Sequence, residues 1–174
     1  MPTSRPIPDS YWLIDGMLLA GEYPGDKNDR RTRSRLTKFL DAGIRTFVDL
    51  TEDSEPLEKY DTLLDELSAA RRVETKHIRR SIRDVSIPRE REQMNQTLNI
   101  IRDEIAAGRP VYVHCWGGVG RTGTVIGCWL VEEGMTGTAA IGTIAQLRGD
   151  TPKASRPSPE TAEQCRFICD WKRS

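Results

Sequence analysis

The strongest chemical pattern in the sequence is the segment VYVHCWGGVGRTGT at residues 111–124. Cys115 and Arg121 lie at the two ends of a loop with three glycines, between an apolar run that favours a buried strand and a run that favours a helix. A glycine-rich turn from a strand into a helix points several backbone N–H groups into one concavity, with the positive end of the helix dipole behind it. The loop is therefore predicted to bind a phosphate-like anion.

Each side chain of this loop has a predicted task. A lone cysteine is usually structural, but here the N–H groups that hold an anion also stabilise the thiolate of Cys115, which favours a nucleophile. Arg121 can bind two phosphate oxygens through its planar guanidinium. Thr122 is expected to donate its hydroxyl to the sulfur when a thiophosphate breaks down, and His114 to orient the loop from behind. The predicted phosphate-binding residues are Trp116, Gly117, Gly118, Val119, Gly120 and Arg121.

HCWGGVGRTG at residues 114–123 resembles the His-Cys-x5-Arg-Ser/Thr signature of the cysteine-dependent protein tyrosine phosphatase superfamily. The match is best with compact dual-specificity members, including the small atypical and cyclin-dependent-kinase-associated phosphatases. The resemblance implies hydrolysis of phosphate monoesters through a phosphocysteine, with no metal or organic cofactor. It also implies a general acid on a loop, for which Asp84 in IRDVSIP is the candidate. The alternative is that Asp84 caps the next helix.

The segment PSPETAEQCRF at residues 157–167 resembles the one that positions the attacking water in many relatives. The resemblance implies that Glu160 and Gln164 have this role. A structural alternative stays open, in which Ser158 caps a helix that has Pro159 at its first position.

The substrate is predicted from the interior of the loop, Trp-Gly-Gly-Val-Gly, which has no lysine. Phosphoinositide phosphatases of the superfamily commonly have lysines there, so the resemblance favours protein phosphotyrosine, with phosphoserine and phosphothreonine as further substrates. The alternatives are a phosphoinositide, inositol phosphate or nucleotide phosphatase, and a catalytically silent phosphate-binding module. A basic cluster around Asp84 is either a solvated face or a positive field for a charged substrate. Its members are Lys76, Arg79, Arg80, Arg83, Arg89 and Arg91.

Composition restricts the partners of the chain. Its 174 residues include 26 basic and 26 acidic side chains, so net charge gives no reason to expect a nucleic-acid partner. No apolar run is long enough to span a bilayer, and the N-terminus does not resemble a signal peptide, so a cytoplasmic monomer without membrane insertion is expected. The cysteines lack zinc-binding spacing, so no metal is expected. Those outside the loop are predicted core residues, namely Cys128, Cys165 and Cys169.

Strand and helix patterns alternate along the chain and predict one α/β phosphatase domain over residues 1–174, with residues 1–10 as an N-terminal arm. Strands are predicted at 11–15, 17–21, 44–50, 76–82 and 111–115, and helices at 28–42, 57–67, 94–108, 124–134, 136–148 and 159–172. Together they predict a mainly parallel sheet of about four to five strands flanked by helices. The phosphate-binding loop then lies between a strand and a helix, as in the protein tyrosine phosphatase fold.

Overall fold

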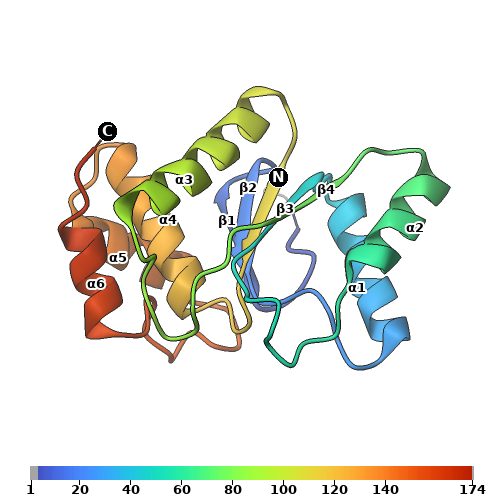
Figure 1. The fold of residues 1–174 in the computed structure, drawn as a ribbon, viewed down its shortest axis with the longest axis horizontal. Coiled ribbons are helices and arrows are strands. Elements are labelled where there is room, and N and C mark those ends of the chain that lie inside the picture. Colours follow the sequence, from blue (N-terminus) through green and yellow to red (C-terminus); the bar gives the residue numbers. More distant parts are fainter. Residues whose placement is uncertain (1–3, 174) are drawn as a thin grey trace.

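The structure of the chain is a computed structural model that describes residues 4–173. A five-stranded sheet in the order β1-β2-β5-β3-β4 forms its centre (Figure 1). The strands are β1 (Ser10–Ile14), β2 (Leu18–Gly21), β3 (Thr46–Asp49), β4 (Lys76–Arg79) and β5 (Val111–His114). β1 and β2 pair antiparallel, whereas the other three pairings are parallel. The predicted mainly parallel α/β fold is thereby confirmed.

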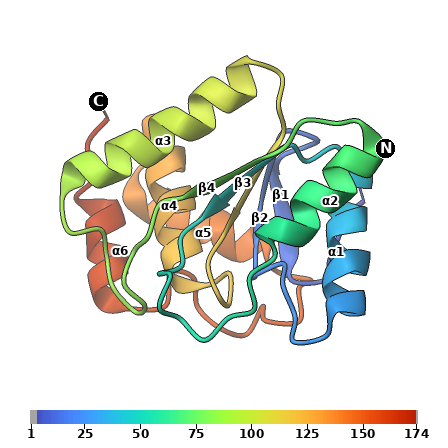
Figure 2. The ribbon, with the colours of Figure 1, turned by 45° about the vertical axis from the view of Figure 1, so that its right-hand side comes forward.

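Helices cover both faces of the sheet (Figures 1 and 2). They are α1 (Asp29–Asp41), α2 (Asp61–Arg71), α3 (Arg91–Ala106), α4 (Gly120–Glu132), α5 (Gly137–Leu147) and α6 (Ala162–Cys169). The first two lie together on one face, and the other four lie on the opposite face with α4 at their centre. This layering is the reason that the central strands are apolar on both sides.

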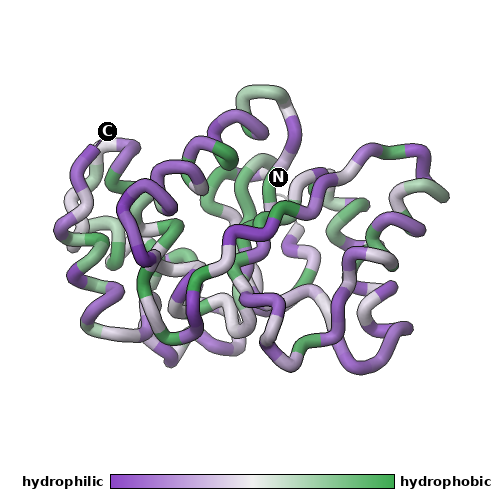
Figure 3. The backbone as a smooth tube through the Cα atoms, viewed as in Figure 1, coloured by the Kyte–Doolittle hydropathy of each residue, from purple (hydrophilic) through white to green (hydrophobic). Residues whose placement is uncertain are grey.

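The alternation of side chains along the central strands divides the core into two clusters. In β5, Val111 and Val113 pack with α3 and α4, whereas Tyr112 between them packs with α1. In β3, Val48 and Phe47 divide in the same way, as expected for a period of two residues. Figure 3 shows the hydrophobic residues gathered along these strands and on helix sides that face them.

The last helix begins three residues later than predicted, at Ala162. Thr161 caps it, because its hydroxyl accepts from the backbone N–H of Gln164 while the Gln164 side chain accepts from the backbone N–H of Thr161. The interpretation of Ser158 as the cap is therefore wrong. The Ser158 hydroxyl instead donates to the carbonyl of Val119, 2.7 Å away, and so connects this segment to the phosphate-binding loop.

Other departures from the predictions are local. The described part of the expected arm, from residue 4 onward, packs against the body of the protein through buried Ile7, and residues 1–3 lie outside the described residues. Cys169 is exposed rather than in the core, whereas Cys128 is buried and Cys165 is partly buried. Among residues 4–173, no helix combines the length and the apolar character needed to cross a bilayer.

Candidate active site

The residues of the predicted loop line a cavity of about 280 Å³ at the carboxyl end of β5. Three segments far apart in the sequence meet there: the loop from β5 into α4, the segment between β4 and α3, and the segment between α5 and α6. The lining residues are Asp84, Val85, Cys115, Trp116, Gly117, Val119, Gly120, Arg121, Lys153, Arg156 and Glu160. Most of the predicted site residues are thus brought together, whereas the lining does not include His114, Gly118, Thr122 and Gln164.

Two glycines let the loop pack tightly between its neighbours. Gly118 has a φ of +70°, and a Cβ there would lie 2.4 Å from the carbonyl carbon of Gly21 at the end of β2. A Cβ on Gly120, the first residue of α4, would lie 2.6 Å from Glu160 Oε2. A larger residue at Gly118 would push the loop away from the backbone of β2, whereas one at Gly120 would displace the side-chain ends of Glu160 and Gln164.

Arg121 is almost completely buried at the base of the cavity and is held by two carboxylates. Its Nη2 lies 3.1 Å from Glu55 Oε2 and 2.9 Å from Asp84 Oδ1, and its Nη1 donates to the carbonyl of Ile82 at 3.0 Å. Burial opposes the charge, but the hydrogen bonds that Arg121 donates to Glu55, together with nearby negative groups, outweigh it and raise the pKa of Arg121. The guanidinium is therefore a fixed cation directly beneath the phosphate-binding loop.

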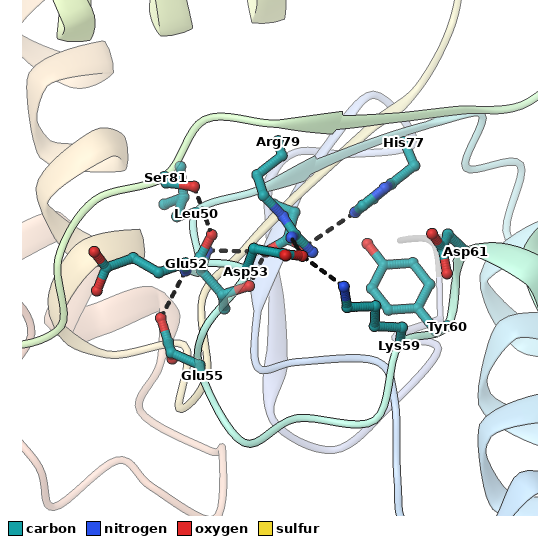
Figure 4. Close-up of polar contacts among 12 residues, drawn as sticks. Leu50, Glu52, Asp53, Glu55, Lys59, Tyr60, Asp61, His77, Arg79 and Ser81 are labelled. Carbon is teal, nitrogen blue, oxygen red and sulfur yellow. Dashed lines mark hydrogen bonds and ion pairs between the residues drawn. The ribbon is translucent and has the colours of Figure 1, made fainter.

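Glu55 was not among the predicted site residues. It comes from the acidic segment between β3 and α2, which hydrogen bonds and ion pairs hold in place (Figure 4). Glu55 Oε1 accepts from the backbone N–H of Glu52 at 2.8 Å, and Asp53 accepts from both Lys59 and Arg79. These contacts present the carboxylate of Glu55 to Arg121.

Asp84 lines the same cavity and comes from the segment between β4 and α3. Its side chain is about half exposed, and its one ion pair among the described residues is with Arg121. Val85 follows with a φ of +57°, a left-handed conformation that is rare and strained for a β-branched residue. Glu90, not Asp84, occupies the N-cap position of α3, so the alternative reading of Asp84 as a helix cap is wrong.

His114 lies directly behind Cys115 and is completely buried. Its Nε2 is 2.7 Å from the hydroxyl of Tyr60, and its Nδ1 is 3.2 Å from the carbonyl of Cys115. Asp49 lies beside it and is also buried, with hydrogen bonds from Thr51. The ring lies next to the loop without lining the cavity, and its role in orienting the loop stays a prediction.

We expect His114 to make the folded state sensitive to acid. Burial lowers its pKa to about 4. In the unfolded chain this imidazole takes up a proton near pH 6.5, so between about pH 6.5 and about pH 4 the unfolded state binds more protons than the folded state. The free energy of unfolding should therefore fall by about 3 kcal/mol as the pH is lowered through this range. Urea unfolding at a series of pH values measures this fall.

The variant His114→Gln is the comparison, since it has no imidazole at that position to titrate. Its free energy of unfolding should fall less between the same two pH values. An equally steep fall in the variant would show that other groups cause the acid sensitivity.

The remaining predicted residues differ in their surroundings. Thr122 is buried, and its hydroxyl has no hydrogen-bond partner among the described residues, the sulfur of Cys115 included. Glu160 lines the cavity, where it pairs with Arg156. Gln164 is buried, and its Nε2 donates to the carbonyl of Ser86 in the segment that carries Asp84. These bonds favour a structural role for Gln164, and water positioning stays a prediction.

The cations that line the cavity are not those of the predicted basic cluster. Lys76 pairs with Glu104, Arg79 pairs with Asp49 and Asp53, and no member of the cluster lines the cavity. Lys153 and Arg156 line it instead. The sequence signal that could have identified them is the pair of basic residues in the loop PKASRPSP, directly before the segment that contains Glu160.

Comparisons with known proteins agree with this geometry. A profile of the family described as "Tc-R-P: Polymorphic toxin system, DSP-PTPase phosphatase" matches residues 24–135. The chain is 37% identical over 124 residues to "Putative tyrosine phosphatase 067L" of Invertebrate iridescent virus 3, covering 70% of this chain and 45% of that protein. It is 31% identical over 140 residues to "Phosphatidylglycerophosphate phosphatase PTPMT2" of Arabidopsis thaliana, covering 79% and 55%. The chain thus spans about half the length of the curated relatives it matches.

Solved structures show the same fold. Tk-PTP in its active form is 26% identical with a TM-score of 0.68, over 95% of this chain and 97% of that chain. PTPMT1 in complex with PI(5)P is 20% identical with the same TM-score, over 92% and 93%. The profile match extends over more than half of the chain and includes Asp84, Cys115 and Arg121. The chain therefore belongs to the family of DSP-PTPase phosphatases, and with it to the cysteine-dependent protein tyrosine phosphatase superfamily.

Proposed function

We propose that the protein hydrolyses phosphate monoesters with Cys115 as the nucleophile. The observation that carries this proposal is the convergence of Cys115, Arg121 and Asp84 on one cavity at the end of β5. The backbone N–H groups of the loop and the guanidinium of Arg121 would hold the phosphoryl oxygens as charge develops on them. The described residues 4–173 would act as one phosphatase domain, since both core clusters pack on the same sheet.

Two chemical steps follow from these positions. In the first, the Cys115 sulfur bonds to phosphorus as the bond to the leaving oxygen breaks, and protonated Asp84 gives its proton to that oxygen. In the second, a water oxygen bonds to phosphorus, the sulfur–phosphorus bond breaks, and Asp84 takes the water proton. The Thr122 hydroxyl would assist the departing thiolate, and Glu160 would orient the water. Neither step needs a metal or an organic cofactor.

Protein phosphotyrosine is the substrate that we favour. The loop interior, from Trp116 to Gly120, has no lysine, and the exposed indole of Trp116 at the mouth offers a flat face to a tyrosyl ring. Lipid substrates are the second candidate, because the Arabidopsis relative is named as a phosphatidylglycerophosphate phosphatase. The solved neighbours include both PTPMT1 with PI(5)P and the PP-IP phosphatase SIW14 of S. cerevisiae.

A substrate panel on metal-free protein tests both parts of the proposal. We expect hydrolysis of 4-nitrophenyl phosphate in the presence of a chelator, and a higher kcat/KM for phosphotyrosine peptides than for dispersed phosphatidylinositol phosphates. A dependence on added metal would contradict the chemistry. A preference for the lipids, with full aryl phosphatase activity, would contradict only the choice of substrate.

A further inference from the structure

Two cations of the segment between α5 and α6 line the cavity, and they differ in what they contact. Lys153 Nζ lies 2.5 Å from Glu22 Oε2 and 3.3 Å from the carbonyl of Gly117. Asp9 Oδ2 lies 3.8 Å from the same Nζ, so Lys153 has two acidic partners, of which Glu22 also pairs with Arg35. Through these contacts Lys153 connects the phosphate-binding loop to the residue that follows β2. The ammonium group of Lys153 is therefore engaged by groups of the protein itself.

The guanidinium of Arg156 has N–H donors that its ion pair with Glu160 does not use. Its side chain is 51% exposed, and its one ion pair within residues 4–173 joins Nη2 to Glu160 Oε1 at 3.1 Å. Its Nη1 lies 3.7 Å from where a Cβ on Gly117 would be, so the guanidinium extends over the edge of the phosphate-binding loop. A planar guanidinium with one edge open can bind a second anion.

A buried cation fixes the backbone that carries Arg156. Arg148 is 3% exposed, and burial lowers its pKa. Its Nη1 donates to the carbonyl of Arg156 at 2.7 Å, and its Nη2 donates to the carbonyl of Lys153 at 2.9 Å. The segment is thus held with Arg156 over the cavity before any ligand arrives, which lowers the entropic cost of using it in binding.

The scissile phosphate does not require this arginine, since the proposed function assigns its binding to the loop N–H groups and to Arg121. The rim of the cavity also has apolar groups. Val85 and Trp116 line it and are 53% and 45% exposed. They are two of only four large hydrophobic side chains exposed in the described part of the chain. The rim thus combines the guanidinium of Arg156, which has N–H donors to offer, with an apolar surface suited to an aromatic ring.

We propose that Arg156 binds a second anionic group of the substrate, an acidic side chain next to the phosphotyrosine. The aromatic ring would lie against Trp116 and Val85, while the acidic side chain would exchange with Glu160 for the guanidinium of Arg156. This inference rests on the proposed function, because it assumes a phosphotyrosyl substrate.

Two phosphotyrosine peptides test it, identical except that the residues on both sides of the phosphotyrosine are Asp in one and Asn in the other. Wild-type kcat/KM should favour the Asp peptide roughly fivefold, as for a partly exposed ion pair. In Arg156→Gln the two peptides should be hydrolysed with equal kcat/KM. The ratio between the peptides is the measurement, because a change in the chemical step through Glu160 would affect both peptides alike. Arg30→Gln, which removes an exposed arginine of α1 outside the cavity, should keep the preference.

Equal loss on both peptides in Arg156→Gln, or a preference that survives it, would overturn the inference. The inference would also be overturned if Arg156→Gln lost hydrolysis of phosphatidylinositol phosphates but kept the wild-type ratio between the two peptides. Arg156 would then bind a lipid headgroup.

If neither peptide is hydrolysed but the aryl phosphate is, the phosphotyrosine part of the proposed function fails by itself. Inhibition by 3-phosphoglycerate and glycerol 3-phosphate then decides whether Arg156 binds a second anion. Stronger inhibition by 3-phosphoglycerate, which has a carboxylate, in the wild type but not in Arg156→Gln supports binding of a second anion by Arg156. Equal inhibition of the wild type by the two compounds excludes it.

Discussion

Replacing Cys115 by serine should reduce phosphatase turnover to background while the protein still binds oxyanions. A serine hydroxyl is far harder to ionise than a thiol, and His114 is not placed to act as its base, because its two ring nitrogens face the hydroxyl of Tyr60 and the carbonyl of residue 115. The anion-binding groups, namely the loop N–H groups and the Arg121 guanidinium, are unchanged by the substitution. Hydrolysis of 4-nitrophenyl phosphate measures the loss of turnover, and calorimetric titration with tungstate measures the retained binding.

Cys169→Ser is the matched control, because Cys169 is an exposed free thiol on α6. It should keep both turnover and tungstate binding. Turnover near the wild-type value in Cys115→Ser would exclude Cys115 as the nucleophile. Loss of tungstate binding together with turnover would mean that the sulfur holds the loop in shape, and the nucleophile would then need direct trapping as a phosphocysteine by rapid quench.

The phosphate-binding loop could be predicted because its causes are local. Three glycines, a buried strand before them and an apolar helix after them leave few other conformations for residues 111–124. The same holds for the α/β architecture, since period-two and period-3.6 patterns alternate along the chain. The start of α6 was also encoded locally, as a capping box at Thr161 and Gln164. It was missed because Ser158-Pro159 offered a second plausible helix start three residues earlier.

The partners of Arg121 could not be predicted because they are distant in the sequence. Glu55 is 66 residues away, and only the parallel pairing of β3 with β5 brings its segment beneath the loop. Arg156 is likewise delivered by a segment whose course depends on the buried Arg148. No spacing rule connects such residues, so the basic cluster near Asp84 was the nearest available signal, and it pointed to cations that do not line the cavity.

Asp84→Asn should lower turnover and tighten oxyanion binding at the same time. General acid catalysis contributes roughly 10² to 10⁴ in rate, so a loss of this size is expected in kcat. The loss should be larger for phenyl phosphate than for 4-nitrophenyl phosphate, because the poorer leaving group depends more on protonation. Binding should improve because Asp84 Oδ1 lies 2.9 Å from Arg121 Nη2 and competes there with the anion. Its charge also repels any dianion that enters the cavity.

Steady-state kinetics on the two esters and tungstate titration distinguish this role from simple damage to the fold. Asp65→Asn, at an exposed position of α2, is the matched control and should change neither measurement. If Asp84 is the general acid and also pairs with the guanidinium of Arg121, its replacement by Asn should lower kcat and raise the affinity for tungstate. The pH dependence of kcat from acid to neutral pH should also become flatter. Equal losses on the two esters with unchanged tungstate affinity would assign the proton transfer to another group. Glu160 is the other exposed carboxylate that lines the cavity, so it would be the first to test in its place.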